Sequence, residues 1–235
     1  MALRLPAPPR ARSTAPRVRA ALPWVASIAA LLFALPVCAR NTAAVEEAPA
    51  GRFDYYVLTL SWSPAYCASR PNDRSECGTR RFAFVLHDLW PQYASGGFPA
   101  HCGAAGAVPP AVIERALAVI PSTGLIRHEW STHGTCSGLA PGQYFDLAER
   151  AFRAIRIPPI FESAVPPQDL PAEQIARAFV AANPRLAAAD LALRCRGPEL
   201  EEVRVCLSRD LVPTACGRDV HTQCRRGPVR ILPLR

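Results

Sequence analysis

The sequence contains no lysine, so arginine alone supplies its permanent positive charge. It also lacks a Cys-x-x-Cys pair, which argues against a structural zinc ribbon, because such sites take their thiolates from closely spaced pairs. No internal repeat occurs, which argues against solenoid and propeller architectures. Half of the 235 residues are apolar, and this composition excludes a disordered or fibrous chain and suits one domain with a sizeable core.

Acidic residues are missing from the first 39 positions, where five arginines precede an apolar run. These arginines are Arg4, Arg10, Arg12, Arg17 and Arg19. The run from Ala21 to Ala39 ends in Val-Cys-Ala, which is typical of a signal that is cleaved after Ala39. An uncleaved anchor is the alternative, but Pro23 and Pro36 interrupt the run and no second apolar run follows. We therefore predict that residues 1–39 are a removable signal peptide, with no stable membrane association afterwards.

Removal of this signal would leave a nearly balanced charge. The whole chain has 27 basic and 19 acidic residues and a net charge of +8, and without the five signal arginines the net charge is +3. A polyanionic partner is therefore compatible with the charge of the mature chain but is not predicted by it.

Eight cysteines remain once Cys38 leaves with the signal. They are Cys67, Cys77, Cys102, Cys136, Cys195, Cys206, Cys216 and Cys224. An even number behind an export signal predicts four disulfides and an oxidising compartment, either the periplasm or the extracellular space. The count alone leaves the pairing open.

Three segments of the mature chain have the character of strands. Residues 53–62 are rich in aromatic and β-branched side chains, and residues 80–91 form a nearly continuous apolar run that Pro91 is expected to end. Residues 200–210 alternate between apolar and polar side chains, which is typical of a half-buried strand.

Three further segments, 110–120, 142–155 and 171–182, repeat apolar residues at helical spacing. Strands at both ends with helices between them, and no regular βαβ alternation, predict an α+β fold in which helices surround an antiparallel sheet. The small and polar residues 40–52 predict a flexible leader, and residues 53–235 predict the folded domain.

Residues 125–138, "LIRHEWSTHGTCSG", crowd two histidines and a glutamate beside a cysteine. A zinc-hydrolase helix carries its two histidines four residues apart, whereas His128 and His133 are five apart and would diverge on a helix. Glu129 and His133 are four apart, so the carboxylate can orient the imidazole and stabilise its charged form. The spacing therefore favours acid–base chemistry over a metal site, although such pairs also occur on ordinary helix surfaces.

A third histidine, His87, lies near the end of the strand predicted at 80–91. Alone it would be interpreted as a buried structural histidine. Together with His133 it can supply the general acid and the general base that a hydroxyl needs to attack phosphorus and expel an alkoxide.

These residues carry a family resemblance. The segments "HDLWPQY" (87–93) and "HEWSTHGTC" (128–136) resemble the two active-site segments of the ribonuclease T2 family, whose usual forms are His-Gly-Leu-Trp-Pro and His-Glu-Trp-x-Lys-His-Gly-x-Cys. The resemblance extends to "LTLSWSPAYC" (58–67), "QYFDLAERAF" (143–152) and "LEEVRVCLSRD" (200–210), and so covers roughly residues 53–224.

The resemblance implies an endoribonuclease that uses no metal ion or other cofactor and cleaves single-stranded RNA with little base preference. The ribose 2′-hydroxyl attacks the adjacent phosphate and a 2′,3′-cyclic phosphate forms, so DNA is not cut. By the family pattern, His133 is the base, His87 the acid, Glu129 a partner near the phosphate, and His128 a substrate contact. Trp90 either stacks on a base or fills the core. We expect the enzyme to be a monomer.

The resemblance also implies a disulfide pairing. It pairs Cys102 with Cys136, Cys195 with Cys224, Cys206 with Cys216, and Cys67 with Cys77.

Two residues depart from the family pattern. Thr132 replaces the usual lysine, which would place positive charge against the phosphate, and loss of one such stabilising group costs about 3 kcal/mol. Arg127 is a candidate substitute for this charge. Asp88 replaces the usual glycine, and we expect its charge to alter the titration of His87. These departures leave a second hypothesis, a catalytically weakened or silent homologue that binds RNA or a protein partner.

Overall fold

The computed structural model describes residues 49–162 and 167–234. The predicted signal peptide, residues 1–39, and residues 40–48 of the predicted leader lie outside the described residues. Within the described part of the chain, no helix combines the length and the apolar character needed to cross a membrane.

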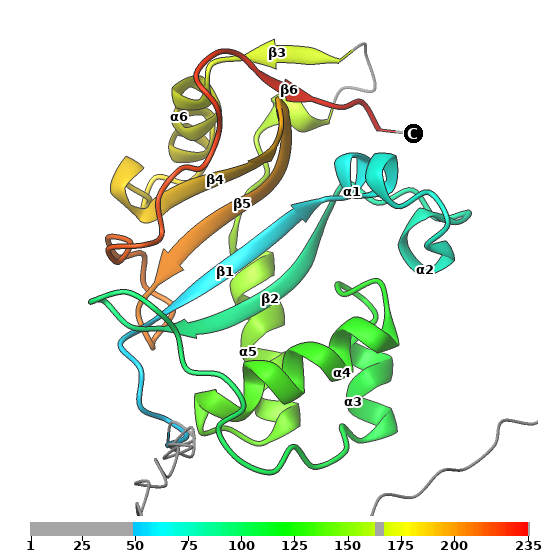
Figure 1. The fold of residues 1–235 in the computed structure, drawn as a ribbon, viewed down its shortest axis with the longest axis vertical. Coiled ribbons are helices and arrows are strands. Elements are labelled where there is room, and N and C mark those ends of the chain that lie inside the picture. The colour runs from blue at the N-terminus through cyan, green and yellow to red at the C-terminus, as the bar shows by residue number, and fades with distance from the viewer. Residues whose placement is uncertain (1–48, 163–166, 235) are drawn as a thin grey trace, which may run out of the picture. The chain divides into compact units, whose positions relative to one another are not determined.

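A six-stranded sheet forms the centre of the fold (Figure 1). Its strands are β1 (Tyr55–Trp62), β2 (Phe84–Gln92), β3 (Gln168–Leu170), β4 (Leu191–Arg196), β5 (Glu199–Leu207) and β6 (Val229–Ile231). The strand order is β2-β1-β5-β6-β3, with β4 paired to β5. Pairing is antiparallel except between β5 and β6, so the predicted α+β class with a mainly antiparallel sheet is confirmed.

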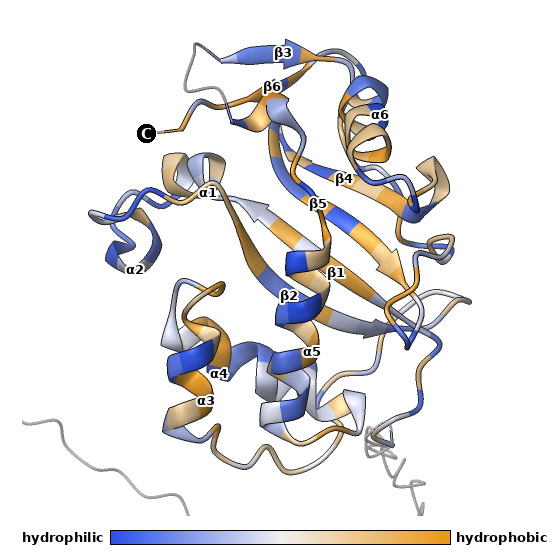
Figure 2. Ribbon diagram, turned by 180° about the vertical axis from the view of Figure 1, so that it is seen from behind, coloured by the Kyte–Doolittle hydropathy of each residue, from blue (hydrophilic) through white to orange (hydrophobic). Residues whose placement is uncertain are grey.

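Six α-helices and three short 3-10 helices occur among the described residues. The α-helices are α1 (Ser63–Ser69), α2 (Arg74–Cys77), α3 (Pro110–Ala116), α4 (Thr123–Thr132), α5 (Pro141–Ala154) and α6 (Ala172–Ala182), and the 3-10 helices are η1 (Gly134–Ser137), η2 (Pro159–Phe161) and η3 (Ala188–Asp190). α5 crosses one face of the sheet over β1 and β2 (Figure 2). The main hydrophobic core lies between this face and the helices.

The strands predicted at 53–62, 80–91 and 200–210 correspond to β1, β2 and β5. The prediction that Pro91 ends its strand is wrong, because β2 continues to Gln92 and Pro91 is paired with Tyr56 of β1. β2 is an edge strand, and an edge position does not require the backbone N–H that proline lacks.

The helices predicted at 110–120, 142–155 and 171–182 correspond to α3, α5 and α6. α3 ends at Ala116, earlier than predicted, and the chain to Ile120 continues as hydrogen-bonded turns. On α5 the buried face includes Tyr144 and Ala151, whereas Phe152 is only partly buried. The hydroxyl of Tyr144 on this face points toward β2 and donates a hydrogen bond to Asp88.

Four disulfides link the described cysteines in the pairs that the resemblance implies: Cys67–Cys77, Cys102–Cys136, Cys195–Cys224 and Cys206–Cys216. Cys136 lies in η1, which directly follows His133. Its disulfide ties the end of α4 to the loop that contains Cys102, so the backbone around His133 is cross-linked.

Candidate active site

A β-bulge in β2 orients the site residues of this strand. Thr59 of β1 lies opposite Asp88, but the next residue of β1 lies opposite Leu86, so His87 is the extra residue of the bulge. In a regular strand, side chains at positions 87 and 90 would point to opposite faces. The bulge brings the His87 and Trp90 rings together instead, with their centroids 5.3 Å apart.

Helix α4 carries the second part of the site. The Ser122 hydroxyl caps its N-terminus by accepting a hydrogen bond from the backbone N–H of Leu125. Glu129 lies on the inner face of the helix and is only 2% exposed. His133 caps the other end, and its Nε2 lies 3.9 Å from Oε2 of Glu129. The predicted sharing of one face by Glu129 and His133 is therefore confirmed.

His87 lies between two buried carboxylates. Its Nε2 is 3.4 Å from Oε1 of Glu129, and its Nδ1 is 3.1 Å from Oε1 of Glu202 on β5. Sequence reasoning missed Glu202, because a glutamate in an alternating strand is normally interpreted as a solvent-facing residue. Both faces of β5 are in fact covered near this point, and Glu202 is only 6% exposed.

Trp90 connects the two histidines. The indole N–H donates to Oε2 of Glu129 at 3.2 Å, and the ring centroid lies 5.5 Å from that of His133. The guanidinium of Arg204 lies over the indole, 5.1 Å from the ring centroid. Trp90 is therefore a part of the site and only partly buried, which favours a substrate contact over a purely structural role.

The two imidazoles have opposite protonation preferences. Burial lowers the pKa of His87, but the hydrogen bonds and charges of Glu129 and Glu202 outweigh it and raise that pKa to about 10. Burial also lowers the pKa of His133, and Glu129 opposes this only in part, so that the pKa falls to about 4. Near neutral pH, His87 is therefore a charged acid and His133 a neutral base.

Asp88 interacts with Glu129 and Tyr144 and not with His87. It is fully buried and accepts a hydrogen bond from the Tyr144 hydroxyl at 2.5 Å. Burial raises the pKa of Asp88 well above its usual range, and the charge of Glu129 adds to this effect. Oδ2 of Asp88 has no hydrogen-bond partner among the described residues, which fits a neutral, protonated carboxyl better than a charged one. The groups that raise the pKa of His87 are Glu129 and Glu202, so the expected effect of Asp88 on that histidine is not direct.

The other predicted site residues of α4 lie farther out. His128 is exposed, and it influences His133 through its charge, which adds to the lowering of the His133 pKa by burial. Arg127 is also exposed. The arginines that line a cavity with His133 are instead Arg194 of β4 and Arg204 of β5.

Gly134 allows the side chains of Trp130 and Tyr144 to pack closely against the backbone next to His133. A Cβ atom at this position would lie 2.5 Å from the Trp130 ring and 3.0 Å from the Tyr144 ring. Any side chain here would push apart the helix that carries Glu129 and the tyrosine that binds Asp88.

A cavity adjoins each histidine. The His133 cavity, of about 370 Å³, is lined by Val57, Trp90, Gln92, Phe98, His133, Arg194, Arg204, Asp219, Val220 and Gln223. The His87 cavity, of about 250 Å³, includes His87, Glu202, Arg70, Arg194 and Arg196 in its lining. Arg194 lines both, so the two cavities share one cationic residue and adjoin the two ends of the histidine pair.

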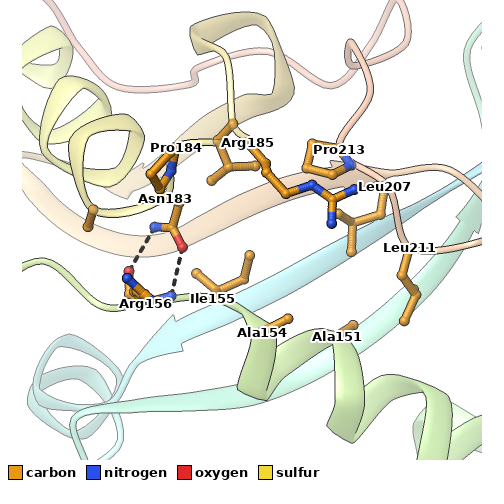
Figure 3. A pocket seen from close by; sticks show the side chains of 12 residues that line it. Ala151, Ala154, Ile155, Arg156, Asn183, Pro184, Arg185, Leu207, Leu211 and Pro213 are labelled. Atoms are coloured by element: carbon orange, nitrogen blue, oxygen red, sulfur yellow. Dashed lines mark hydrogen bonds between the residues drawn. The ribbon is translucent and has the colours of Figure 1, made fainter.

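A separate cavity of about 240 Å³ lies between α5, the end of α6 and β5 (Figure 3). The side chain of Asn183 lines this cavity. Its Oδ1 accepts a hydrogen bond from the backbone N–H of Arg156 at 2.8 Å, and its Nδ2 donates one to the Arg156 carbonyl at 2.9 Å. None of its lining residues belongs to the His87 or the His133 cavity. It is therefore distinct from the candidate site.

Within the described residues, one group of side chains has the composition of a metal site: Asp88, Glu129 and His133, whose ligand atoms lie within 4.8 Å of one another. It differs from the His128–Glu129–His133 alternative considered from the sequence, because His128 is exposed. The raised pKa of Asp88 and the lowered pKa of Glu129 account for the same cluster as a neutral carboxyl beside a charged one.

Comparisons with known proteins find relatives both by sequence and by fold. A ribonuclease of Aeromonas hydrophila is 45% identical over 108 residues, which are 46% of this chain and 49% of that protein. The chain spans about half the length of the curated relatives that it matches first. Among solved structures, an RNase-related protein from Calystegia sepium matches 77% of this chain and 98% of its own, with a TM-score of 0.60 at 24% identity.

RNase NT in complex with 5′-AMP matches 78% of this chain and 99% of its own, with a TM-score of 0.60 at 20% identity. At this level of identity the two structural matches establish the fold. The model of the ribonuclease T2 family matches residues 53–216, most of the folded part and both segments that carry the site. The chain therefore belongs to the ribonuclease T2 family.

Proposed function

We propose that this protein is an exported endoribonuclease that cleaves single-stranded RNA with little base preference and without a metal ion. The ribose 2′-oxygen attacks the adjacent phosphorus, the bond from phosphorus to the 5′-oxygen breaks, and a 2′,3′-cyclic phosphate remains. Water can open this cyclic ester in a second step, so the first step is that of a lyase and the complete reaction that of a hydrolase.

The observation that carries this proposal is the opposite protonation of two histidines on one carboxylate. His133, neutral near pH 7, accepts the proton of the 2′-hydroxyl as the 2′-oxygen attacks. His87, charged near pH 7, gives its proton to the departing 5′-oxygen. One proton is taken and one is given, so the site supplies both transfers from groups already in the required states.

Glu129 acts between these two groups. It lies 3.4 Å from His87 and 3.9 Å from His133, so it can stabilise whichever imidazole carries the proton. As the reaction proceeds, His133 gains a positive charge and His87 loses one. Glu129 is therefore well placed to balance the charge of the site throughout the transfer.

Substrate binding is supported by the lining of the two cavities. Arg194 and Arg204 bring positive charge to the His133 cavity, where the phosphate would bind. Trp90 and Phe98 contribute aromatic rings to the same cavity, and the Phe98 side chain is 54% exposed. Aromatic stacking tolerates any base, which suits a relaxed preference. RNase NT, which has the same fold, has been solved with the nucleotide 5′-AMP. The need for a 2′-hydroxyl as nucleophile restricts the reaction to RNA.

Export is supported by the cysteines. All eight cysteines of the proposed mature chain are paired in disulfides, which persist in the periplasm or outside the cell. We propose that residues 1–39 are removed on export, that 40–52 form a leader, and that 53–235 form the catalytic domain. Every proposed catalytic group comes from one chain, so a monomer is sufficient for activity.

The test is an assay of purified, EDTA-treated protein on single-stranded RNA and on single-stranded DNA, with analysis of the ends produced. We expect RNA to be cut to 2′,3′-cyclic phosphate ends and DNA to remain intact. His133→Ala is expected to abolish cutting, and His221→Ala, the removal of an exposed histidine outside both cavities, is expected to leave it unchanged.

The missing lysine at position 132 favours one alternative, a weakened or silent homologue that retains the scaffold. The same samples distinguish the two functions. Binding of RNA without cleavage, or cleavage that persists in His133→Ala, would contradict the enzyme proposal. Loss of cleavage after EDTA that zinc or magnesium restores would contradict its metal independence.

A further inference from the structure

We propose that Glu202 is a positioning residue for the general acid, which binds Nδ1 of His87 and holds the ring protonated with its Nε2 directed into the site. This inference rests on the proposed function, because it concerns the acid of that same reaction. No residue of β5 belongs to the two active-site segments of the sequence, so Glu202 adds a third element, β5, to the strand β2 and the helix α4.

The geometry assigns different tasks to the two ring nitrogens of His87. Nδ1 lies 3.1 Å from Oε1 of Glu202, close enough for a hydrogen bond from its N–H, while Nε2 lies toward Glu129 at 3.4 Å. Ser61 of β1 also approaches Nδ1, at 3.4 Å. An acceptor fixed on Nδ1 determines which nitrogen delivers its proton, and here it leaves Nε2 for the leaving group.

Glu202 is itself firmly oriented. Its second oxygen, Oε2, accepts hydrogen bonds from Nε and Nη2 of Arg204, at 3.0 and 2.8 Å. Arg204 in turn lies over the ring of Trp90. The backbone of β5 pairs with β1 on one side and β4 on the other at this position, with Glu202 opposite Ser61 and Arg194. One oxygen is therefore committed to Arg204 and the other to His87.

Charged groups of both signs surround this pair. The titratable and charged groups that face His87 or its partner are Glu76 of α2, Glu129 of α4, His133 after α4, Arg194 of β4, and Glu202 and Arg204 of β5, and Tyr66, Arg70, Asp73, Arg196 and Glu201 line the same cavity. Burial raises the pKa of Glu202, but His87 and Arg204 outweigh it, so the pKa is lowered overall and the carboxylate stays charged. A buried carboxylate in this state needs cationic partners, and here these are the charged His87 on one oxygen and Arg204 on the other.

Two carboxylates around one imidazole separate two tasks during catalysis. Glu129 is shared with His133, which becomes charged when it takes the 2′-proton. Glu202 contacts His87 and not His133, so it keeps the acid oriented while the charge of Glu129 is drawn toward the base. Without Glu202, both histidines would depend on one carboxylate.

Glu202→Gln is the direct test, because glutamine keeps the shape and an acceptor oxygen but removes the charge. Loss of one neighbouring carboxylate moves a histidine pKa by about 1–3 units. We expect the alkaline limb of kcat/KM to move to lower pH by about one to two units from its position near pH 10, so that kcat/KM at pH 9 falls about twofold to tenfold relative to its value at pH 6. Glu202→Asp, which restores the charge, is expected to recover part of the shift. Glu199→Gln, at the start of the same strand, is the matched control.

NMR titration of His87 separates this inference from the proposed function, because it requires no cleavage. In the full-length protein the pKa of His87 is expected to fall in Glu202→Gln and to remain above its ordinary value in Glu129→Gln. An unchanged titration and pH profile in Glu202→Gln would overturn the inference. If Glu202→Gln does not fold, the titration of His87 in Glu129→Gln decides. An ordinary His87 pKa in Glu129→Gln would overturn the proposed role of Glu202.

Discussion

His87 and His133 contact the two oxygens of a single carboxylate. Nε2 of His87 lies 3.4 Å from Oε1 of Glu129, and Nε2 of His133 lies 3.9 Å from Oε2. The two imidazoles are separated by sequence and by fold, since one comes from the bulge of β2 and the other from the end of α4. Their protonation states are coupled through Glu129, and this coupling underlies the predictions below.

The activity should depend on pH over a wide window. The pKa of His133 is lowered to about 4, so the base is neutral and ready above that pH. The pKa of His87 is raised to about 10, so the acid is charged and ready below that pH. We expect kcat/KM to rise with pH through about 4 and to fall through about 10. If both limbs of the pH profile lay close to 6.5, the ordinary pKa of histidine, the site would not shift the pKa values of His87 and His133 apart.

The pH profile does not identify which histidine is the acid. A comparison of two substrates whose leaving groups differ in their need for a proton does. A nucleoside 3′-(4-nitrophenyl) phosphate expels a stable phenolate that needs no proton. His87→Ala is expected to lower cleavage of RNA by about 10²–10⁴ and to leave cleavage of the phenyl ester close to that of the unchanged protein. His133→Ala is expected to lower both rates. Equal losses on both substrates for His87→Ala would assign His87 another role.

Asp88 should act as a neutral hydrogen-bonding group. Asparagine is neutral and keeps an acceptor oxygen for Tyr144, so Asp88→Asn is expected to fold with a free energy of unfolding within about 1 kcal/mol of the unchanged protein. Asp88→Ala removes the acceptor of the Tyr144 hydroxyl in a fully buried place and should cost about 1–3 kcal/mol in denaturant unfolding. A loss in Asp88→Asn as large as in Asp88→Ala would show that Asp88 is charged in the folded protein.

Thr132→Lys should raise turnover. The family pattern has lysine here, and a cation against the phosphate stabilises the transition state by about 3 kcal/mol. We expect kcat on RNA to increase about tenfold or more, provided that the added amine reaches the phosphate beside His133. Thr132→Met, which has similar length without charge, is the control. An unchanged or lower kcat in Thr132→Lys would mean that Arg204 already supplies this charge.

Gly134→Ala should disturb both stability and activity. The added methyl group would lie 2.5 Å from Trp130 and 3.0 Å from Tyr144, so the packing behind His133 must shift. Such overpacking costs about 1–3 kcal/mol of unfolding free energy. Gly124→Ala, on the same chain but with its nearest atom 3.5 Å away, is the matched control and is expected to have little effect. Equal thermal midpoints for the two variants would contradict the close packing at Gly134.

The sequence was sufficient to predict the parts of the fold that depend on local patterns. Alternation and apolar runs identified β1, β2 and β5, helical spacing identified α3, α5 and α6, and the resemblance implied all four disulfides. The short strands β3 and β6, with three residues each, carry too few side chains to show a period.

The parts of the site that escaped prediction depend on contacts between distant segments. Spacing identified the Glu129–His133 pair, but the bulge at His87 exists only in the pairing of β2 with β1. Glu202 lies on a strand paired on both sides, and its side chain is buried against His87 and Arg204, which its own alternation does not reveal. The role of Asp88 likewise depends on a tyrosine 56 residues away.

The most direct test of the central claim is an RNA oligonucleotide in which one nucleotide lacks its 2′-hydroxyl. EDTA-treated protein should cut the linkages that follow the ordinary ribonucleotides and leave 2′,3′-cyclic phosphate ends there. It should spare the linkage on the 3′ side of the deoxy nucleotide. Cleavage at that linkage, or ends without a cyclic phosphate, would show that the nucleophile is not the 2′-hydroxyl and would contradict the assignment of His133 and His87 as its base and acid.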